Sequence, residues 1–411
     1  MKALLGLLLI SGAALADRPK PIPDFEDTAA LDGAYEITSL KDIERKGLIS
    51  GSSGIDLWSG SYWPQYQGSL AVRYRDPQVA SLITQEAQYK AFKELSVKTP
   101  LYSYYGRENI LSPAEKYDLV VGDPAMSLTA YSWNLGHKNG GSSESGKVPI
   151  WRGICDGFAS ASQMMPRPTK SVVLQTPSGT PITFYPEDIK ALGSLSYARS
   201  QRNPIFIGKR CLSGALFFTD ACDETNPGTF HKALVNRVGA MKKSFVADIS
   251  PGSEVWNYPV KDYSIVYYNV FSGDESTSYA EVAEVFNKKL KFAKVERRHK
   301  NTAYIVGATV TVHYADMRVA NLLETDSVAQ DKTLEMVYSY DLELDANGKI
   351  LGGESASRNL PDFIWAPNDI TYPKSDSELN GRASLVEMAQ ASSKKGQPLA
   401  IIVERLFERA R

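Results

Sequence analysis

Apolar and polar positions alternate roughly in the last third of the chain. Residues 303–313 and 334–344 are rich in Val, Thr, Ile and Tyr, a composition and pattern that predict strands. The Asp-Ala-Asn-Gly run at 345–348 predicts a tight turn that leads the second strand back into 349–351. This run faintly resembles a calcium loop, but it lacks the glutamate that such a loop needs at its twelfth position. We therefore interpret it as a hairpin turn within an antiparallel β-rich region that begins near residue 275.

Helix signals are concentrated in the middle of the chain. Ser112-Pro113-Ala114-Glu115 is a capping box with proline at the first helical position, and it predicts a helix that Gly122 ends. A second helix is expected from Cys155, because small residues that permit close packing follow it as far as Pro166. Between these helices, the Gly, Ser and Asn content of 136–146 predicts a flexible loop. Helices followed by strands predict an α+β fold.

Changes of pattern divide the chain into four ranges. Residues 1–16 have the character of an export signal, and 17–98 form a mixed N-terminal region, which could be a propeptide or the wall of a cleft. Residues 99–274 form the central domain, and 275–411 form the β-rich region. The N-terminal region holds an aromatic cluster that would either pack as core, the better interpretation, or line a cleft: Trp58, Tyr62, Trp63, Tyr66 and Tyr74.

The first residues predict export from the cytoplasm. Lys2 precedes a short apolar run at 3–10, and Ala14-Leu15-Ala16 has the small-residue pattern of a signal-peptide cleavage site before Asp17. The apolar run is too short to span a bilayer and no other stretch is long enough, so no integral membrane segment is expected. The mature protein should be secreted or periplasmic.

The charge balance narrows the classes of partner. With 46 basic and 47 acidic residues, the chain has no surplus charge to attract nucleic acid or an anionic membrane. Proteins or small molecules are therefore the expected partners.

Export changes how the three cysteines are interpreted, because an odd number in an oxidising compartment leaves one thiol unpaired. A disulfide between the neighbouring Cys211 and Cys222 would leave Cys155 free. At the start of a helix, the backbone N–H groups and the helix dipole favour a thiolate, and the same groups can hold an oxyanion. Asp156 opposes thiolate formation through its like charge. A nucleophilic Cys155 is the hypothesis, and a buried structural cysteine is the alternative.

A nucleophilic thiol needs a base, and the sequence has only four histidines. His299 lies in a Glu-Arg-Arg-His-Lys run that is typical of solvated surface, and His137 lies in the flexible loop. His313 lies in a predicted strand, where a structural role is the better interpretation. His231 follows an Asn-Pro-Gly-Thr-Phe run just after the proposed disulfide. We therefore predict that His231 is the base.

Asp248 is the expected orienting partner of His231. If 230–238 and 242–249 form a hairpin with a turn at Gly239-Ala240, these two side chains lie directly opposite each other, within hydrogen-bonding reach. The apolar residues of 230–238 also fit one face of a helix, and a helix here would break the pairing. The hairpin is the interpretation that we favour.

Several motifs, in the same order along about 58–365, make the chain resemble the transglutaminase elicitor family, known from oomycete cell walls and marine bacteria. They are 112–118 (Ser-Pro-Ala-Glu-Lys-Tyr-Asp), Trp151-x-Gly153-x-Cys155-x-Gly157, 184–192 (Phe-x-x-x-Asp-Ile-Lys-Ala-Leu), 219–222 (Thr-Asp-Ala-Cys), 226–231 (Asn-Pro-Gly-Thr-Phe-His), 254–260 (Glu-Val-Trp-Asn-Tyr-Pro-Val), 352–354 (Gly-Gly-Glu) and 362–365 (Asp-Phe-Ile-Trp). The sequence departs from the family pattern beside the nucleophile, with Asp156 where His is more frequent and Phe158 where Trp is usual.

The resemblance implies a protein-glutamine γ-glutamyltransferase, or transglutaminase. In that reaction the Cys155 thiolate attacks a glutamine side-chain amide, ammonia leaves, and a lysine or another primary amine takes the acyl group. The resemblance places Cys155, His231 and Asp248 at the family's catalytic positions. It also implies a papain-like core within the α+β fold and partners that are proteins bearing glutamine and lysine.

The resemblance further implies that calcium could be required, although no spacing in the sequence shows a calcium site. Asp220, Asp223 and Glu224 are candidates, but a solvated loop is the better interpretation of this stretch. Trp133 and Trp151 could stabilise the oxyanion or line the acyl channel, and simple packing is an equally open role for each.

Two other functions stay open at this point. A papain-like thiol peptidase or amidase would use the same triad and would let water, in place of an amine, resolve the acyl-enzyme. A secreted interaction protein with a decayed enzyme site is the other alternative, and Asp156 is the only hint of it.

Overall fold

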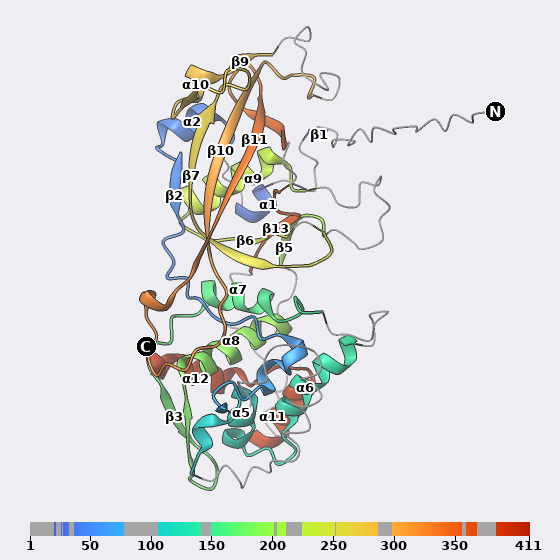
Figure 1. Cartoon of the computed structure of the whole chain (residues 1–411), viewed down its shortest axis with the longest axis vertical. Helices are drawn as coiled ribbons and strands as arrows, with labels where there is room; N and C mark the ends of the chain where they lie inside the picture. Colours follow the sequence, from blue (N-terminus) through green and yellow to red (C-terminus); the bar gives the residue numbers. More distant parts are fainter. Residues whose placement is uncertain are drawn as a thin grey trace, which may run out of the picture.

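The computed structural model describes residues 20–21, 26, 28–32, 37–77, 106–140, 149–200, 204–210, 224–250, 252–286, 298–355, 359–367 and 384–411. Their helices and strands separate into two lobes along the long axis of the molecule (Figure 1). A sheet lobe fills the upper half of this view and a helical lobe fills the lower half, with α7 (Cys155–Met164) near their junction. The chain is therefore a mixed α+β protein, as the sequence predicts.

One antiparallel sheet forms most of the sheet lobe. Among the described residues its strands follow the order β1-β12-β11-β10-β7-β6-β13-β5, and β2, β8 and β9 pair beside this path. The sheet twists and curls along its length (Figure 1). The strands are β1 (Lys20–Pro21), β2 (Ser50–Ser52), β5 (Ile205–Gly208), β6 (Val246–Asp248), β7 (Asn257–Tyr268), β8 (Glu275–Ser276), β9 (Glu284–Val285), β10 (Tyr304–Ala315), β11 (Thr333–Leu344), β12 (Ile350–Ser355) and β13 (Phe363–Ala366). Short helices accompany it: α1 (Ala29–Asp32), α2 (Leu40–Arg45) and α10 (Tyr279–Val282).

The strands predicted at 303–313 and 334–344 are confirmed as β10 and β11, which pair antiparallel along their whole length. In β11 the buried Tyr338, Tyr340 and Leu342 alternate with more exposed neighbours, because one face of the sheet covers a core. The predicted turn at 345–348 leads directly into β12, which pairs back onto β11. The β-rich character of this part of the chain is therefore confirmed.

Residues 230–238 are helical, so the hairpin predicted between 230–238 and 242–249 is wrong. Asn226 caps α9 (Pro227–Ala233), which has proline at its first position and continues into a π-helical segment, Leu234–Ala240. The apolar side chains of this run are buried against the sheet, as the helical alternative requires. β6 pairs with β7 and β13 instead.

The helical lobe confirms the predicted capping box. Ser112 accepts a hydrogen bond from the Glu115 backbone N–H, the Glu115 carboxylate accepts one from the Ser112 N–H, and Gly122 ends the helix at a φ of 73°. α6 extends to Gly140, so the loop predicted at 136–146 is wrong for its first residues. The elements are α5 (Pro113–Val121), α6 (Ser127–Gly140), α7, α8 (Pro186–Ser200), α11 (Leu385–Lys394), α12 (Ala400–Ala410), β3 (Val172–Gln175) and β4 (Pro181–Phe184).

Each lobe has its own core of buried apolar side chains. Trp58, Trp63 and Tyr74 belong to the core of the helical lobe, which confirms the core interpretation of the N-terminal aromatic cluster for these residues. Both cores draw residues from 17–98, from 99–274 and from 275–411, and the domain boundaries stay predictions. Within the part of the chain that the structure describes, no helix is long and apolar enough to cross a membrane.

α7 and α8 pack closely because Gly157 has no side chain. A Cβ at Gly157 would lie 2.0 Å from the Ser194 carbonyl oxygen and 2.7 Å from the Ala198 Cβ. Both distances are shorter than van der Waals contact, so only glycine allows the approach. The prediction that small residues after Cys155 permit close helix packing is therefore confirmed at this position.

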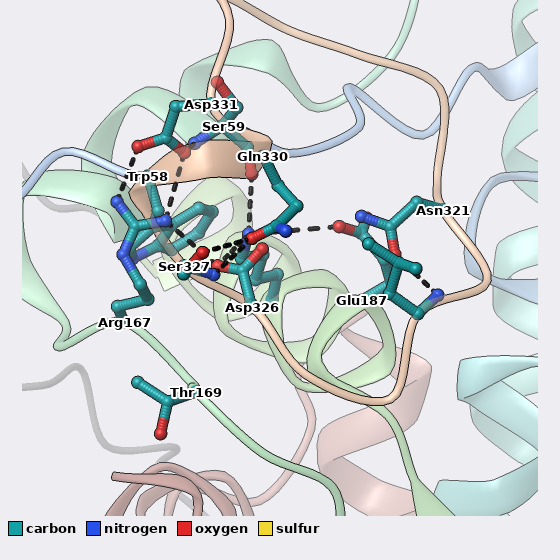
Figure 2. A network of polar contacts seen from close by, with 12 residues as sticks. Trp58, Ser59, Arg167, Thr169, Glu187, Asn321, Asp326, Ser327, Gln330 and Asp331 are labelled. Atoms are coloured by element: carbon teal, nitrogen blue, oxygen red, sulfur yellow. Dashed lines mark hydrogen bonds and ion pairs between the residues drawn. The ribbon is translucent and has the colours of Figure 1, made fainter.

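The long connection between β10 and β11, residues 316–332, reaches onto the helical lobe through a group of mostly buried charges, here called the interlobe ion cluster (Figure 2). Arg167 forms ion pairs with Asp331 at 2.7 Å and with Asp326 at 3.0 Å. Lys190 pairs with Asp326 at 2.9 Å and Arg318 pairs with Glu187 at 2.5 Å. The cluster consists of Asp56, Arg167, Glu187, Lys190, Arg318, Asp326 and Asp331. It ties the sheet lobe to the lobe that carries α7.

Candidate active site

Cys155 is the first residue of α7, as predicted, and it is 6% exposed. The residues before it are held against the segment that contains Tyr62. The Ile154 N–H donates to the Tyr62 carbonyl at 2.7 Å. A Cβ at Gly153 would lie 2.3 Å from the same oxygen, so glycine is required there. This contact fixes the point at which α7 begins and thus the position of the thiol.

A cleft of about 810 Å³ opens beside Cys155. The helical lobe contributes Trp151, Arg152 and Ala198 to its walls. The sheet lobe and its loops contribute Phe206, Gly208, Arg210, Val255, Asn257, Phe363 and Trp365. Phe206 is 53% exposed and stacks on Trp365 with ring centroids 5.6 Å apart, which gives the sheet side of the cleft an aromatic surface.

The Cys155 sulfur makes two polar contacts with the sheet lobe. The thiol donates to the Val255 carbonyl oxygen over 3.6 Å, and Asn257 Nδ2 donates to the sulfur over 3.5 Å. Asn257 Oδ1 in turn accepts a hydrogen bond of 2.8 Å from the Trp365 indole N–H. The nucleophile candidate on one lobe is therefore bound to the first residue of β7 on the other.

Cys155 is a protonated thiol at neutral pH in this environment. Burial and, after it, the adjacent Asp156 charge raise the pKa of the thiol, the Asn257 N–H groups lower it, and the net pKa is about 11. Burial and the Asp156 charge thus oppose the thiolate-favouring effect expected from the start of a helix. The sulfur must lose its proton as it attacks, so a proton acceptor is required nearby.

Asp248 lies next to Asn257 across the sheet. The two residues are directly paired in the β6–β7 register, which places both side chains on one face. Asp248 Oδ1 accepts hydrogen bonds from the Trp256 N–H at 2.8 Å and from the Ser250 hydroxyl at 2.9 Å. Its Oδ2 is buried and has no hydrogen-bond partner among the described residues, and burial raises the pKa of the carboxyl. One carboxylate oxygen is therefore uncommitted on the cross-strand neighbour of Asn257, the residue that contacts the thiol.

His231 lies on α9 inside the core of the sheet lobe. Its Nδ1 is hydrogen-bonded to the Tyr340 hydroxyl at 3.1 Å, and its ring packs at 6.1 Å from the Tyr267 ring. Nε2 is buried without a hydrogen-bond partner in the described part of the chain, and burial lowers the pKa of the imidazole to about 3. The hydrogen bond expected between His231 and Asp248 is not formed. A catalytic role for His231 stays a prediction.

The two candidate tryptophans occupy different surroundings. Trp151 lines the cleft, where the Arg152 and Arg210 guanidinium groups lie 5.5 Å and 5.6 Å from its ring. Trp133 is buried in the core of the helical lobe and packs against Gly68, the packing role that the sequence left open. Of the pair, Trp151 is the one that lines the cleft beside Cys155.

Some predicted features fall outside the described residues. Cys211 and Cys222 lie there, and so do the calcium candidates Asp220 and Asp223. The predicted signal peptide at 1–16 is also outside. Within the described ranges, no group of three or more His, Cys, Asp or Glu side chains could hold a metal ion.

Asn257 and Trp365 were not singled out as site residues from the sequence. Both occur in the motifs at 254–260 and 362–365, but the sequence carries no signal that joins them to Cys155. His313 has the structural role predicted for it, because Asp262 and Glu335 on the neighbouring strands hold its ring nitrogens at 2.6 Å and 3.0 Å.

A buried thiol at a helix N-terminus, in a cleft between two lobes, is an arrangement that thiol-dependent acyl-transfer sites use. The transglutaminase elicitor family model matches residues 34–380, and the chain belongs to this family. The crystal structure of the GP42 transglutaminase from Phytophthora sojae shares the fold, with a TM-score of 0.60 at 21% identity over 94% of this chain and 96% of that one. None of the curated proteins matches the chain.

Proposed function

We propose that this protein is a protein-glutamine γ-glutamyltransferase in which Cys155 is the nucleophile. The observation that carries the proposal is the position of the Cys155 thiol, buried at the start of α7 and open to the cleft between the lobes. Membership of the transglutaminase elicitor family supplies the reaction class. The export signal predicted at 1–16 would place this reaction outside the cytoplasm, with proteins as substrates.

The reaction follows in two steps. The Cys155 sulfur attacks the γ-carboxamide carbon of a glutamine side chain, the C–N bond breaks, and the thiol proton goes to the departing nitrogen, which leaves as ammonia. A lysine ε-amine or another primary amine then attacks the thioester, forms the new amide and returns a proton to the sulfur. We assign the stabilisation of the oxyanion in both steps to N–H groups at the start of α7, the helix that begins at Cys155. No step is assigned to calcium.

Asp248 is the group that we propose to carry the proton between sulfur and nitrogen. Its Oδ2 is buried and uncommitted, its cross-strand neighbour Asn257 contacts the sulfur, and its charge contributes to the raised pKa of the thiol. His231 is the alternative from the sequence. Its Nε2 is buried without a hydrogen-bond partner among the described residues, and burial lowers the pKa of the imidazole to about 3.

The walls of the cleft support transfer to an amine over hydrolysis. Trp151, Phe206, Phe363 and Trp365 supply apolar surface along which a lysine stem can lie and which limits access of water to a thioester. A peptidase would need no such protection, because water is its acceptor.

Incorporation of a fluorescent primary amine into a glutamine-containing protein tests the proposal. We expect labelling and ammonia release by the wild type and complete loss of both in Cys155→Ala, with little change in melting temperature. Ser162→Ala, a buried substitution on the same helix, is the control and should retain labelling. Backbone cleavage without amine incorporation would assign a peptidase. Absence of both activities, with Cys155 still open to alkylation, would assign a decayed site.

A further inference from the structure

The side-chain amide of Asn257 has one chemically allowed orientation. The Trp365 indole nitrogen can only donate a hydrogen bond, so the Asn257 atom that it contacts at 2.8 Å must be the carbonyl oxygen. The NH₂ group is then directed at the Cys155 sulfur, 3.5 Å away. Asn257 and Trp365 are 4% and 2% exposed, so water does not compete strongly for either contact.

We propose that Asn257 is a positioning residue for the nucleophile: its amide, held by Trp365, donates an N–H to the Cys155 sulfur and stabilises the thiolate that forms during attack. A donor favours the charged form of its acceptor, so this contact strengthens as the sulfur loses its proton. The same contact also fixes the sulfur on the cleft side of the junction between lobes. The inference rests on Cys155 as the nucleophile of the proposed function.

The contact counteracts surroundings that otherwise disfavour a thiolate. Burial and the Asp156 charge on α7 raise the pKa of the thiol, and the Asp248 charge on β6 acts in the same direction. Two tyrosines also face the sulfur, Tyr62 from the helical lobe and Tyr258 from β7, and burial raises the pKa of each phenol. No positive side chain is among the largest influences on this thiol, and the two arginines that line the cleft are Arg152 and Arg210. The Asn257 backbone N–H and, after it, the Asn257 side-chain amide oppose these effects.

The rate of Cys155 alkylation by iodoacetamide as a function of pH tests the inference, with the modified peptide read by mass spectrometry. Asn257→Asp keeps an acceptor for Trp365 and the size of the side chain but removes the side-chain donor that faces the sulfur, while the backbone N–H of residue 257 stays in place. We expect the pH profile to shift to the alkaline side and the rate at pH 8 to fall about tenfold or more, because one unit of pKa changes the thiolate fraction tenfold.

Trp365→Phe is the second variant, because it frees the amide without adding a charge. We expect its alkylation profile to shift in the same direction by a smaller amount. This variant also keeps the test valid if Asn257→Asp does not fold. Trp58→Phe is the matched control, since its buried indole N–H donates to the Met165 carbonyl oxygen at 3.2 Å, away from the sulfur. Its alkylation profile should equal that of the wild type.

An unchanged alkylation profile in both Asn257→Asp and Trp365→Phe would overturn the inference. An equal change in Trp58→Phe would also overturn it, because the effect would then reflect general loosening of the fold. Alkylation needs neither glutamine nor amine, so it separates the two proposals. A protein without acyl transfer whose thiol still responds to Asn257→Asp keeps this inference and loses the proposed function.

Discussion

At the scale of single residues, a substitution at His231 can show whether this histidine is structural or catalytic. In His231→Asn, the side-chain amide lies near the position of Nδ1 and can still bond to the Tyr340 hydroxyl. The substitution removes Nε2, which has no hydrogen-bond partner among the described residues. We expect His231→Asn to lower the free energy of unfolding by about 1–3 kcal/mol through lost ring contacts and to leave amine incorporation near the wild-type rate. If a stably folded His231→Asn protein incorporated amine about two orders of magnitude more slowly than the wild type, His231 would be the base.

The lowered pKa of His231 also predicts how the free energy of unfolding depends on pH. The pKa of His231 is about 3 when folded and near the ordinary 6.5 when unfolded, so the unfolded chain binds the proton first as the pH falls. The stability is fully present above pH 6.5 and is lost between this value and about pH 3, by up to ~1.4 kcal/mol per pH unit. Thermal melting across this window should show a slope that His231→Asn reduces. Equal slopes in the wild type and in His231→Asn would show that His231 is not the source of this pH dependence.

At the scale of elements, the packing of α7 on α8 depends on one glycine. Alanine at position 157 would gain helix propensity, but its Cβ would meet the Ser194 carbonyl oxygen at 2.0 Å. We expect Gly157→Ala to destabilise the protein by about 1–3 kcal/mol and to lower amine incorporation, because the start of α7 shifts together with Cys155.

A helix substitution without a clash is the control for this prediction. Asn134→Ala, on the exposed side of α6, should change the free energy of unfolding by no more than about 0.5 kcal/mol. Chemical denaturation of both variants measures the difference. A Gly157→Ala protein as stable as the wild type would show that α8 can move to accept the methyl group.

At the scale of the whole molecule, the interlobe ion cluster ties the 316–332 connection of the sheet lobe to the helical lobe. Arg167→Met leaves Asp326 and Asp331 without their shared guanidinium partner in a buried setting, so we expect a loss of about 3–5 kcal/mol in the free energy of unfolding. Proteolysis within 316–332 should become faster as this connection loosens. Arg45→Met removes an ion pair from the surface, with Asp42, and should leave both measurements unchanged. Similar behaviour of the two variants would contradict the role of the cluster.

Local patterns in the sequence were sufficient for several elements of the fold. The capping box at 112–115, the strands β10 and β11 and the start of α7 at Cys155 depend on residues within a few positions of one another, so the sequence alone predicts them. The wrong assignment at 230–238 has a physical reason as well. The same apolar residues satisfy a strand or a helical face, and burial against the sheet decided for the helix.

The site around Cys155 was decided by tertiary structure. Asn257 lies 102 residues from Cys155 along the chain and Trp365 lies 108 residues from Asn257, and only the pairing of β7 and β13 with β6 brings them together. The sequence alone identified the nucleophile candidate, because its position at the start of a helix is a local property. The surroundings of the thiol depend on which distant strands pair and which lobe faces which, and such contacts leave no local pattern in the sequence.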